Sequence, residues 1–157
     1  MMNKKVIFTF IILFVAIASI SSVSAWWFFG GGNDATVNDV TFHLPEGFDV
    51  DNPVKSDSDN TYERTVYKNT ENKDTVDIRV EDKSMEDSVI GNSLIKKGYE
   101  KKNIDGKDGF YHTNVLSKTV DFVYIDNDKV VSIIVPLVYD QYGDNVKSYE
   151  ELLSEII

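Results

Sequence analysis

From residue 37 onward, the sequence consists of short apolar runs that alternate with polar residues and are separated by turn-forming residues. The clearest run covers residues 75–80, where Val76, Ile78 and Val80 alternate with polar side chains. This period of two places the three aliphatic side chains on one face of a β-strand. Short alternating strands joined by turns are typical of an antiparallel sheet with one face in water. The pattern therefore restricts the chain to folds built on such a sheet.

The expected elements follow in the order three strands, one helix, four strands and a second helix. We expect the strands at residues 40–44, 62–67, 75–80, 99–104, 110–117, 120–125 and 130–135. Capping boxes at residues 84–87 and 148–151 predict the two helix starts, and Gly98 predicts the end of the first helix. The predicted fold class is therefore α+β, with an antiparallel sheet of six to seven strands, two helices packed on it and a hydrophobic N-terminal helix in front.

Three segments are expected to lie outside this framework. Residues 26–36 are predicted to form an aromatic and glycine-rich linker, so the single domain would span residues 37–157. Residues 49–60 and 136–145 are rich in turn-forming residues and predict loops. Residues 130–135, by contrast, are almost entirely apolar, which predicts a central strand covered on both faces.

The first 25 residues have the composition of a targeting segment. Lys4 and Lys5 precede an apolar run over residues 6–20, and the segment closes on Val23-Ser24-Ala25, with small residues at positions 23 and 25. This order is that of a secretory signal peptide, and the run is shorter than the roughly 20 residues that a membrane-spanning helix needs. We therefore expect cleavage after Ala25 and a secreted, extracytoplasmic protein.

An uncleaved membrane anchor is the alternative, because four aromatic residues extend the uncharged stretch as far as residue 32. These residues are Trp26, Trp27, Phe28 and Phe29. Tryptophan is enriched at membrane interfaces, and the two lysines near the N-terminus would stay on the inner side of the membrane. The domain would then be anchored to the outer face of the cell membrane.

The chain is strongly acidic, with 16 Lys and Arg against 26 Asp and Glu and a formal charge of −10. Such a charge repels nucleic acid, so we expect no nucleic-acid partner. The expected partner is a protein or small ligand outside the cell. Because the chain has no cysteine, an exported domain cannot use disulfides, and its stability must come from the packed core.

Residues that suit catalysis or metal binding do not form a known motif. His43 and His112 are the two histidines, and neither lies in a Gly-x-Ser-x-Gly or His-Glu-x-x-His pattern. Strand alternation places His43 on the solvent face. Three acidic segments lack the spacing of an EF-hand; they contain Asp49, Asp51, Asp57 and Asp59, then Asp126 and Asp128, and last Asp140 and Asp144. We expect no catalytic residue, no metal ligand and no cofactor.

A contact surface is expected in the segment at residues 136–145. Tyr139, Gln141 and Tyr142 combine aromatic area with hydrogen-bonding groups there. Together these features predict a non-catalytic binding or cell-surface accessory protein. The alternative from another functional class is a small hydrolase or metal-dependent enzyme that uses the acidic loop residues.

Two short stretches carry a resemblance to known proteins. They are Phe42-His43-Leu44-Pro45-Glu46-Gly47-Phe48 and Ile104-Asp105-Gly106-Lys107-Asp108-Gly109-Phe110-Tyr111. Together with the mid-chain helix, they resemble small exported proteins of unknown function from methanogenic archaea, and the element order is distantly similar to that of PsbP-like α+β domains. The resemblance implies an α+β layout and a binding or accessory role, and it implies no site residue.

Overall fold

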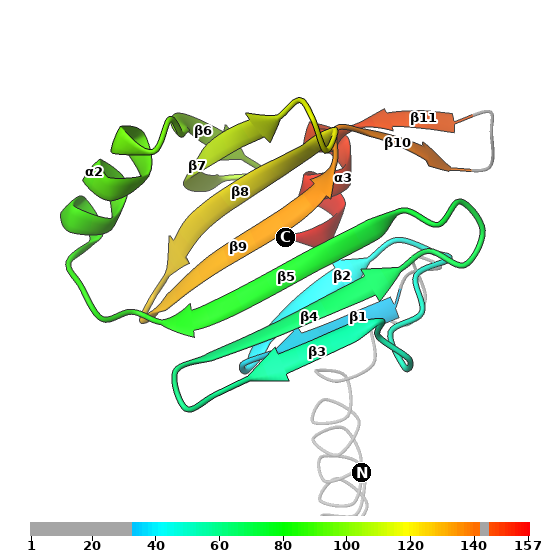
Figure 1. The fold of residues 1–157 in the computed structure, drawn as a ribbon, viewed down its shortest axis with the longest axis horizontal. Helices are drawn as coiled ribbons and strands as arrows, with labels where there is room; N and C mark the ends of the chain where they lie inside the picture. Colours follow the sequence, from blue (N-terminus) through cyan, green and yellow to red (C-terminus); the bar gives the residue numbers. More distant parts are fainter. Residues whose placement is uncertain (1–32, 142–144) are drawn as a thin grey trace, which may run out of the picture. The chain divides into compact units, whose positions relative to one another are not determined.

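The computed structural model of the protein describes residues 33–141 and 145–157. The elements, labelled as in Figure 1, are β1 (Asn33–Val37), β2 (Val40–Leu44), β3 (Lys55–Ser58), β4 (Tyr62–Lys68), β5 (Thr75–Asp82), α2 (Asp87–Lys96), β6 (Glu100–Ile104), β7 (Lys107–Asn114), β8 (Thr119–Asp126), β9 (Lys129–Pro136), β10 (Val138–Gln141), β11 (Asn145–Ser148) and α3 (Tyr149–Ile156). Neither of these helices is long and apolar enough to cross a membrane. The expected N-terminal helix and residues 26–29 lie outside the described residues.

Seven strands form one antiparallel sheet in the order β3-β4-β5-β9-β8-β7-β6, with β9 at its centre (Figure 1). The mostly antiparallel architecture with two helices confirms the predicted α+β class. The strand predicted first in this sheet, β2, instead pairs with β1 in a separate two-stranded sheet. A second two-stranded sheet joins β10 to β11.

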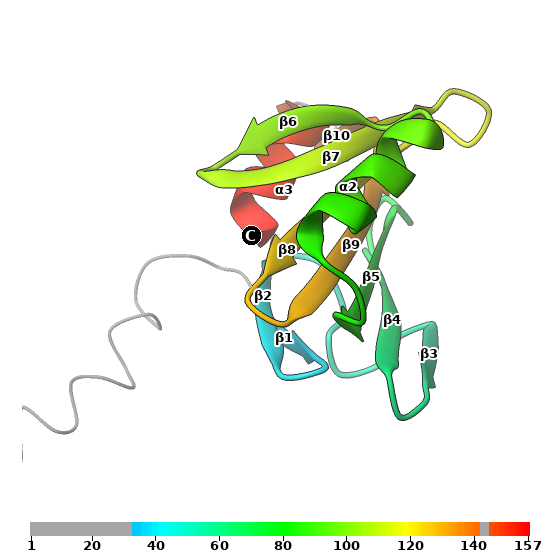
Figure 2. The same ribbon diagram turned by 90° about the vertical axis from the view of Figure 1, so that its left-hand side faces the viewer.

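One face of the seven-stranded sheet carries the core. Ile78 on β5, Ile133 on β9 and Phe122 on β8 lie opposite one another and are fully buried. The β1–β2 hairpin and α3 lie together on one side of the sheet (Figure 2). The helix contributes three buried side chains to the same cluster, namely Leu152, Leu153 and Ile156. The C-terminal helix therefore packs on the core face of the sheet.

The opposite face of the sheet is covered only in part. There α2 packs beside β7, and Gly91 lies so close to Phe110 that a Cβ atom at Gly91 would be 2.8 Å from the Phe110 Cζ atom. On β9, the side chains of Val130 and Ile134 point to this face and are only half-buried. The prediction that residues 130–135 are covered on both faces is therefore wrong, because α3 and the β1–β2 hairpin both pack on the core side.

The domain begins earlier than predicted. Residues 33–36, expected to belong to a linker, form most of β1 and pair with β2. Asn38 and Asp39 have positive φ angles of 44° and 65° and make a two-residue turn between the strands. Asn and Asp tolerate this left-handed conformation better than most other residues. Because Ala35 is also buried in the core, the linker prediction is wrong for residues 33–36.

Both predicted loops also contain strands. Residues 49–60 include β3, and residues 136–145 include β10 with the first residue of β11. All four residues of β3 are exposed, and the strand lies at an edge of the sheet. Short, charged edge strands are common because they discourage pairing with other chains. A strand with no buried residue shows no apolar alternation, and the sequence pattern therefore does not reveal it.

The helix ends follow the predicted signals only in part. Ser148 and Glu151 form the predicted capping box of α3, in which the Ser148 amide donates to Glu151 Oε2 over 2.7 Å. Gly98 follows α2 with a φ of +91°, as expected for a glycine that ends a helix. The capping box predicted at residues 84–87 is not formed. The N-cap is Glu86, which makes no side-chain capping hydrogen bond.

Tyr139 lies in the core and not in an exposed loop. Its side chain is fully buried, and its ring stacks on that of Phe48 with 5.9 Å between centroids. Asn69 Nδ2 donates a hydrogen bond of 2.8 Å to the Tyr139 hydroxyl. Alternation along β10 turns Tyr139 inward, whereas Val138 beside it is exposed. The prediction that Tyr139 belongs to an exposed contact surface is therefore wrong.

Tyr139→Phe is expected to lower the free energy of unfolding by about 1–3 kcal/mol, because Asn69 Nδ2 would lose its buried acceptor. Urea denaturation followed by circular dichroism measures this change. Tyr111→Phe is the matched control, since the Tyr111 hydroxyl bonds to Glu100 at an exposed position. This control should change the free energy of unfolding by less than about 0.5 kcal/mol. Equal effects of the two substitutions would contradict a special role for the buried bond.

Candidate functional site

The residues predicted to form a contact surface do not all lie where they were expected. Tyr139 is in the core. Gln141 pairs with Asn145 in the β10–β11 hairpin. Tyr142 lies outside the described residues. Tyr139 is therefore not available to a partner at this surface.

The two histidines lie on different sheets and have different surroundings. His43 is on the solvent face of β2, as predicted, with its Nδ1 atom 2.9 Å from Asp34 Oδ1. His112 is on β7, where its ring lies 5.1 Å from that of Tyr99. Within residues 33–141 and 145–157, no group of three or more His, Asp or Glu side chains is placed to hold a metal ion.

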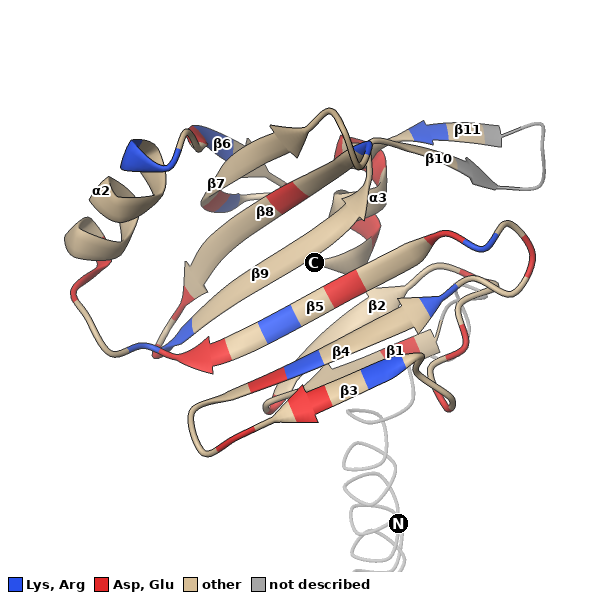
Figure 3. Cartoon of the chain, viewed as in Figure 1, with Lys and Arg blue, Asp and Glu red and all other residues tan. Residues whose placement is uncertain are grey.

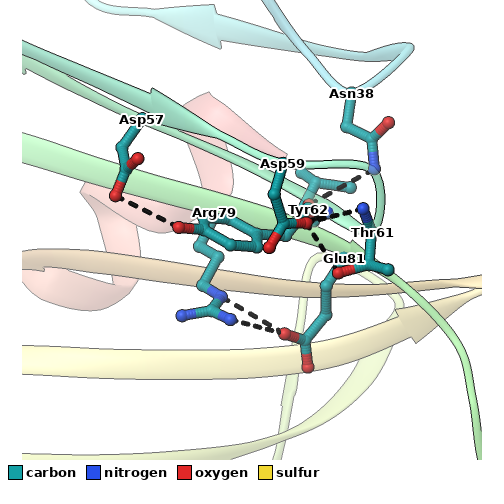
Figure 4. Close-up of polar contacts among 8 residues, drawn as sticks. Asn38, Asp57, Asp59, Thr61, Tyr62, Arg79 and Glu81 are labelled. Atoms are coloured by element: carbon teal, nitrogen blue, oxygen red, sulfur yellow. Dashed lines mark hydrogen bonds and ion pairs between the residues drawn. The ribbon is translucent and has the colours of Figure 1, made fainter.

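The acidic residues of the β3–β4 connection form local hydrogen bonds. Figure 4 shows Asp59 beside Thr61, whose amide and hydroxyl both donate to Asp59 Oδ1 over 2.7 Å. These hydrogen bonds lower the pKa of Asp59. Asp57 accepts a hydrogen bond of 3.1 Å from the Tyr62 hydroxyl. Both carboxylates therefore stabilise the hairpin, which is a common role for aspartate in turns.

A cleft of about 360 Å³ lies between α2 and the uncovered part of the sheet, and we call it the α2 cleft. Its apolar lining comes from the sheet, from α2 and from the segment before the helix. These residues are Met85, Ile90, Leu94, Val123 and Val130. Val123 is almost fully buried, whereas Met85 is largely exposed at the margin. The cleft thus has an apolar floor that is open to solvent.

The polar part of the α2 cleft is centred on Asp121 of β8. The Tyr99 hydroxyl donates to Asp121 Oδ2 over 2.5 Å, and the Ser132 hydroxyl donates to Asp121 Oδ1 over 2.8 Å. Burial raises the pKa of Tyr99 well above its usual range, with further contributions from the hydrogen bond to Asp121 and from its charge. Tyr99 therefore remains a neutral hydrogen-bond donor at physiological pH.

This arrangement differs from a nucleophile and base pair. In such a pair the serine hydroxyl donates to a base, usually histidine, which a third group orients. Here Ser132 donates directly to a carboxylate. His112 packs its ring against Tyr99, and in the described part of the chain it forms no hydrogen bond with Ser132. The cluster therefore fixes the position of Asp121 and does not activate a serine.

Charged side chains surround the α2 cleft on the β5 side and at the end of α2. Arg79 Nη2 lies 3.0 Å from Glu81 Oε2, and the Arg79 guanidinium lies 4.4 Å from the centroid of the Tyr62 ring (Figure 4). Lys97 follows the last residue of α2 and lines the cleft. It forms no ion pair within the described residues. The margin thus carries one paired cation and one unpaired cation.

The uncovered face of the sheet is divided into two zones. In Figure 3, charges of both signs follow one another along β3, β4 and β5, whereas the middle of β9 carries none. The two arginines of the chain, Arg64 and Arg79, are directly opposite each other on β4 and β5. Asp77 and Glu81 pair with them and offset their repulsion. The α2 cleft lies where this charged zone meets the apolar one.

Sequence reasoning does not single out Tyr99, Asp121 or Ser132, because Asp121 lies on β8, Ser132 on β9 and Tyr99 between α2 and β6. Comparison with protein-family models, with curated proteins and with solved structures finds no match. The resemblance to exported proteins of methanogens and to PsbP-like domains therefore remains a prediction. No relative suggests a ligand for the α2 cleft.

The stability of the domain is expected to fall as the pH rises above about 10, the ordinary pKa of tyrosine. Because the folded-state pKa of Tyr99 is raised, the unfolded chain loses this proton first, and above pH 10 the folded state binds more protons. The free energy of unfolding then decreases with pH. Burial raises the pKa of Tyr124 and acts in the same direction.

Urea denaturation between about pH 8 and pH 11 tests this dependence. Tyr99→Phe removes the ionisation of Tyr99, so this variant should lose less stability over this range than the unchanged protein. An equal loss of stability in both proteins would show that the pKa of Tyr99 is not raised in the folded state.

Proposed function

We propose that this chain is an extracytoplasmic, non-catalytic binding module that holds a small ligand in the α2 cleft. The observation that carries the proposal is the open apolar floor of the cleft, which is bordered by a few polar groups in fixed positions. Small-molecule sites have this composition, and their volumes are about 300–1,000 Å³. The volume of about 360 Å³ is consistent with one small ligand.

The hydrogen bonds in the cleft favour binding over catalysis. Both oxygens of Asp121 accept hydrogen bonds from hydroxyl groups, and these contacts hold the carboxylate in one orientation. A general base would need to accept a proton from a substrate or a nucleophile. The hydroxyls of Tyr99 and Ser132 both point to Asp121, so neither is prepared to attack a substrate. A pre-oriented polar cluster of this kind suits recognition.

The uncovered floor is also unusual for a surface with a purely structural role. α2 contributes only Ile90 and Gly91 as buried residues, and Leu94 is half-buried. Val89 and Ile95 on the same helix remain about half-exposed. The α2 wall of the cleft therefore leaves apolar side chains accessible to a ligand.

The location outside the cytoplasm rests on the N-terminal sequence alone. We expect that a native-like host cleaves the chain after Ala25, so that its intact mass begins at Trp26 and the protein is found in the soluble fraction. Mass spectrometry with membrane fractionation measures both properties. A full-length mass in the membrane fraction would contradict cleavage and would favour the anchored form, with the aromatic residues 26–29 at the interface.

The neutral apolar dye Nile red tests the binding surface. We expect the full chain to enhance the fluorescence of Nile red, and Val130→Glu to weaken dye binding by at least about tenfold, because a charge on the apolar floor must stay solvated. Ile134→Glu is the matched control, because Ile134 is on the same face of β9 but does not line the cleft. It should change dye affinity by less than about twofold.

Thermal unfolding shows whether both variants remain folded. Loss of dye binding in both variants, or in neither, would contradict the α2 cleft as the binding surface.

A further inference from the structure

We propose that the ligand of the α2 cleft is a zwitterion with an apolar side chain, of the size and chemistry of a free aliphatic amino acid. This inference rests on the proposed binding function of the same cleft. It names the class of ligand from the charges that the cleft leaves without an opposite charge.

Most charged groups that line the cleft already form an ion pair. Glu81 pairs with Arg79, and Asp82 pairs with Lys129 over 2.6 Å. Two charged groups remain. Asp121 receives hydrogen bonds only from the neutral hydroxyls of Tyr99 and Ser132, and Lys97 has no ion-pair partner in the described residues. The cleft thus presents one negative and one positive charge that lack a partner.

The Asp121 carboxylate is suited to an ammonium group. A carboxylate has about four acceptor sites, so two remain after the bonds from Tyr99 and Ser132. These two hydroxyls hold the carboxylate in place without neutralising its charge. Because Asp121 is partly buried, its attraction for a cation is screened less than at a fully exposed site. The α-ammonium group of a ligand can therefore form an ion pair with the Asp121 carboxylate.

Lys97 and Arg79 are suited to a carboxylate. Lys97 is the C-cap residue of α2 and lines the cleft, and its ammonium group has three donors. Arg79 uses Nε and Nη2 for Glu81, which leaves Nη1 for a ligand. Charge-assisted hydrogen bonds from such groups are about twice as strong as neutral ones. The two cations border the cleft on the α2 side and on the β5 side.

The apolar floor is suited to the side chain of the ligand. Ile90 and Leu94 line the cleft from α2, and Val123 and Val130 line it from the sheet. Met85 at the margin is unbranched and adapts to the shape of its neighbour. An aliphatic side chain would displace water from this surface and gain about 25 cal/mol for each Å² of apolar area buried.

The net charge of the protein favours a zwitterion over a simple ion. A chain with a formal charge of −10 repels small anions, so a carboxylate alone meets an unfavourable field. A simple cation meets Lys97 and Arg79 at the margin. A zwitterion carries no net charge and satisfies both unpaired groups at once. The three requirements together define an amino acid with an aliphatic side chain.

Isothermal titration calorimetry of the full chain with three probes of the same carbon skeleton tests this inference. L-leucine carries both charges, isocaproate lacks the ammonium group and L-leucinamide lacks the carboxylate. We expect L-leucine to bind and each of the other two probes to bind at least about tenfold more weakly. Equal affinity for L-leucine and either analogue overturns the zwitterion, because one of the two charges would then be unused.

Three substitutions assign the charges to residues. Asp121→Asn should weaken the binding of L-leucine but not that of isocaproate, because isocaproate has no ammonium group for Asp121. Lys97→Gln should weaken the binding of L-leucine but not that of L-leucinamide, which has no carboxylate for Lys97. Lys96→Gln is the matched control, because Lys96 is the neighbour of Lys97 on α2 and does not line the cleft. Lys97 is exposed, so its variant is expected to fold even if Asp121→Asn destabilises the domain.

The Nile red measurement separates failure of this inference from failure of the proposed function. If Val130 governs dye binding and L-leucine does not bind, the cleft remains a binding site but its ligand is not an aliphatic amino acid. If L-leucine binds and none of the variants at positions 97 and 121 weakens it, the site lies elsewhere and the inference is overturned.

Discussion

The packing of the three central strands is the contact on which the rest of the structure depends. Ile78, Ile133 and Phe122 form one row across β5, β9 and β8, and all three are fully buried. The β1–β2 hairpin and α3 both pack on this side of the sheet, so the core draws on both ends of the described chain. Without cysteine, this apolar layer must provide most of the stabilisation.

The one-sided core also leaves the opposite face of the sheet open for the ligand that we propose. Strand alternation that buries one set of β9 side chains necessarily turns the other set to the opposite face, where α2 is too short to cover them. Both edge strands of the sheet, β3 and β6, are rich in charged residues and discourage pairing with another chain. The partly covered face therefore combines apolar area, fixed polar groups and access to solvent in one place.

The sequence predicts the central strands well, and also the turns that join β4 to β5 and β6 to β9 in succession, because alternation and turn residues are local signals. It predicts β1 and β3 poorly. Three glycines directly precede β1 and indicate a linker, and β3 has no buried side chain and therefore no apolar alternation. The burial of Tyr139 is not predicted, because composition alone does not tell which way a tyrosine in a short strand points. The cluster of Tyr99, Asp121 and Ser132 was beyond prediction, because its members are distant in sequence and meet only through strand register and the end of α2.

We propose that the face between α2 and β9 is the functional surface of this protein. Methyl-resolved nuclear magnetic resonance during titration with Nile red tests it most directly, because the methyl groups of the cleft report contact with the dye at each residue. We expect the methyl signals of the cleft to shift together, namely those of Ile90, Leu94, Val123 and Val130. The methyl signals of Leu152 and Ile156 on the core side should stay unchanged. Shifts concentrated at α3, or spread evenly over the domain, would contradict it.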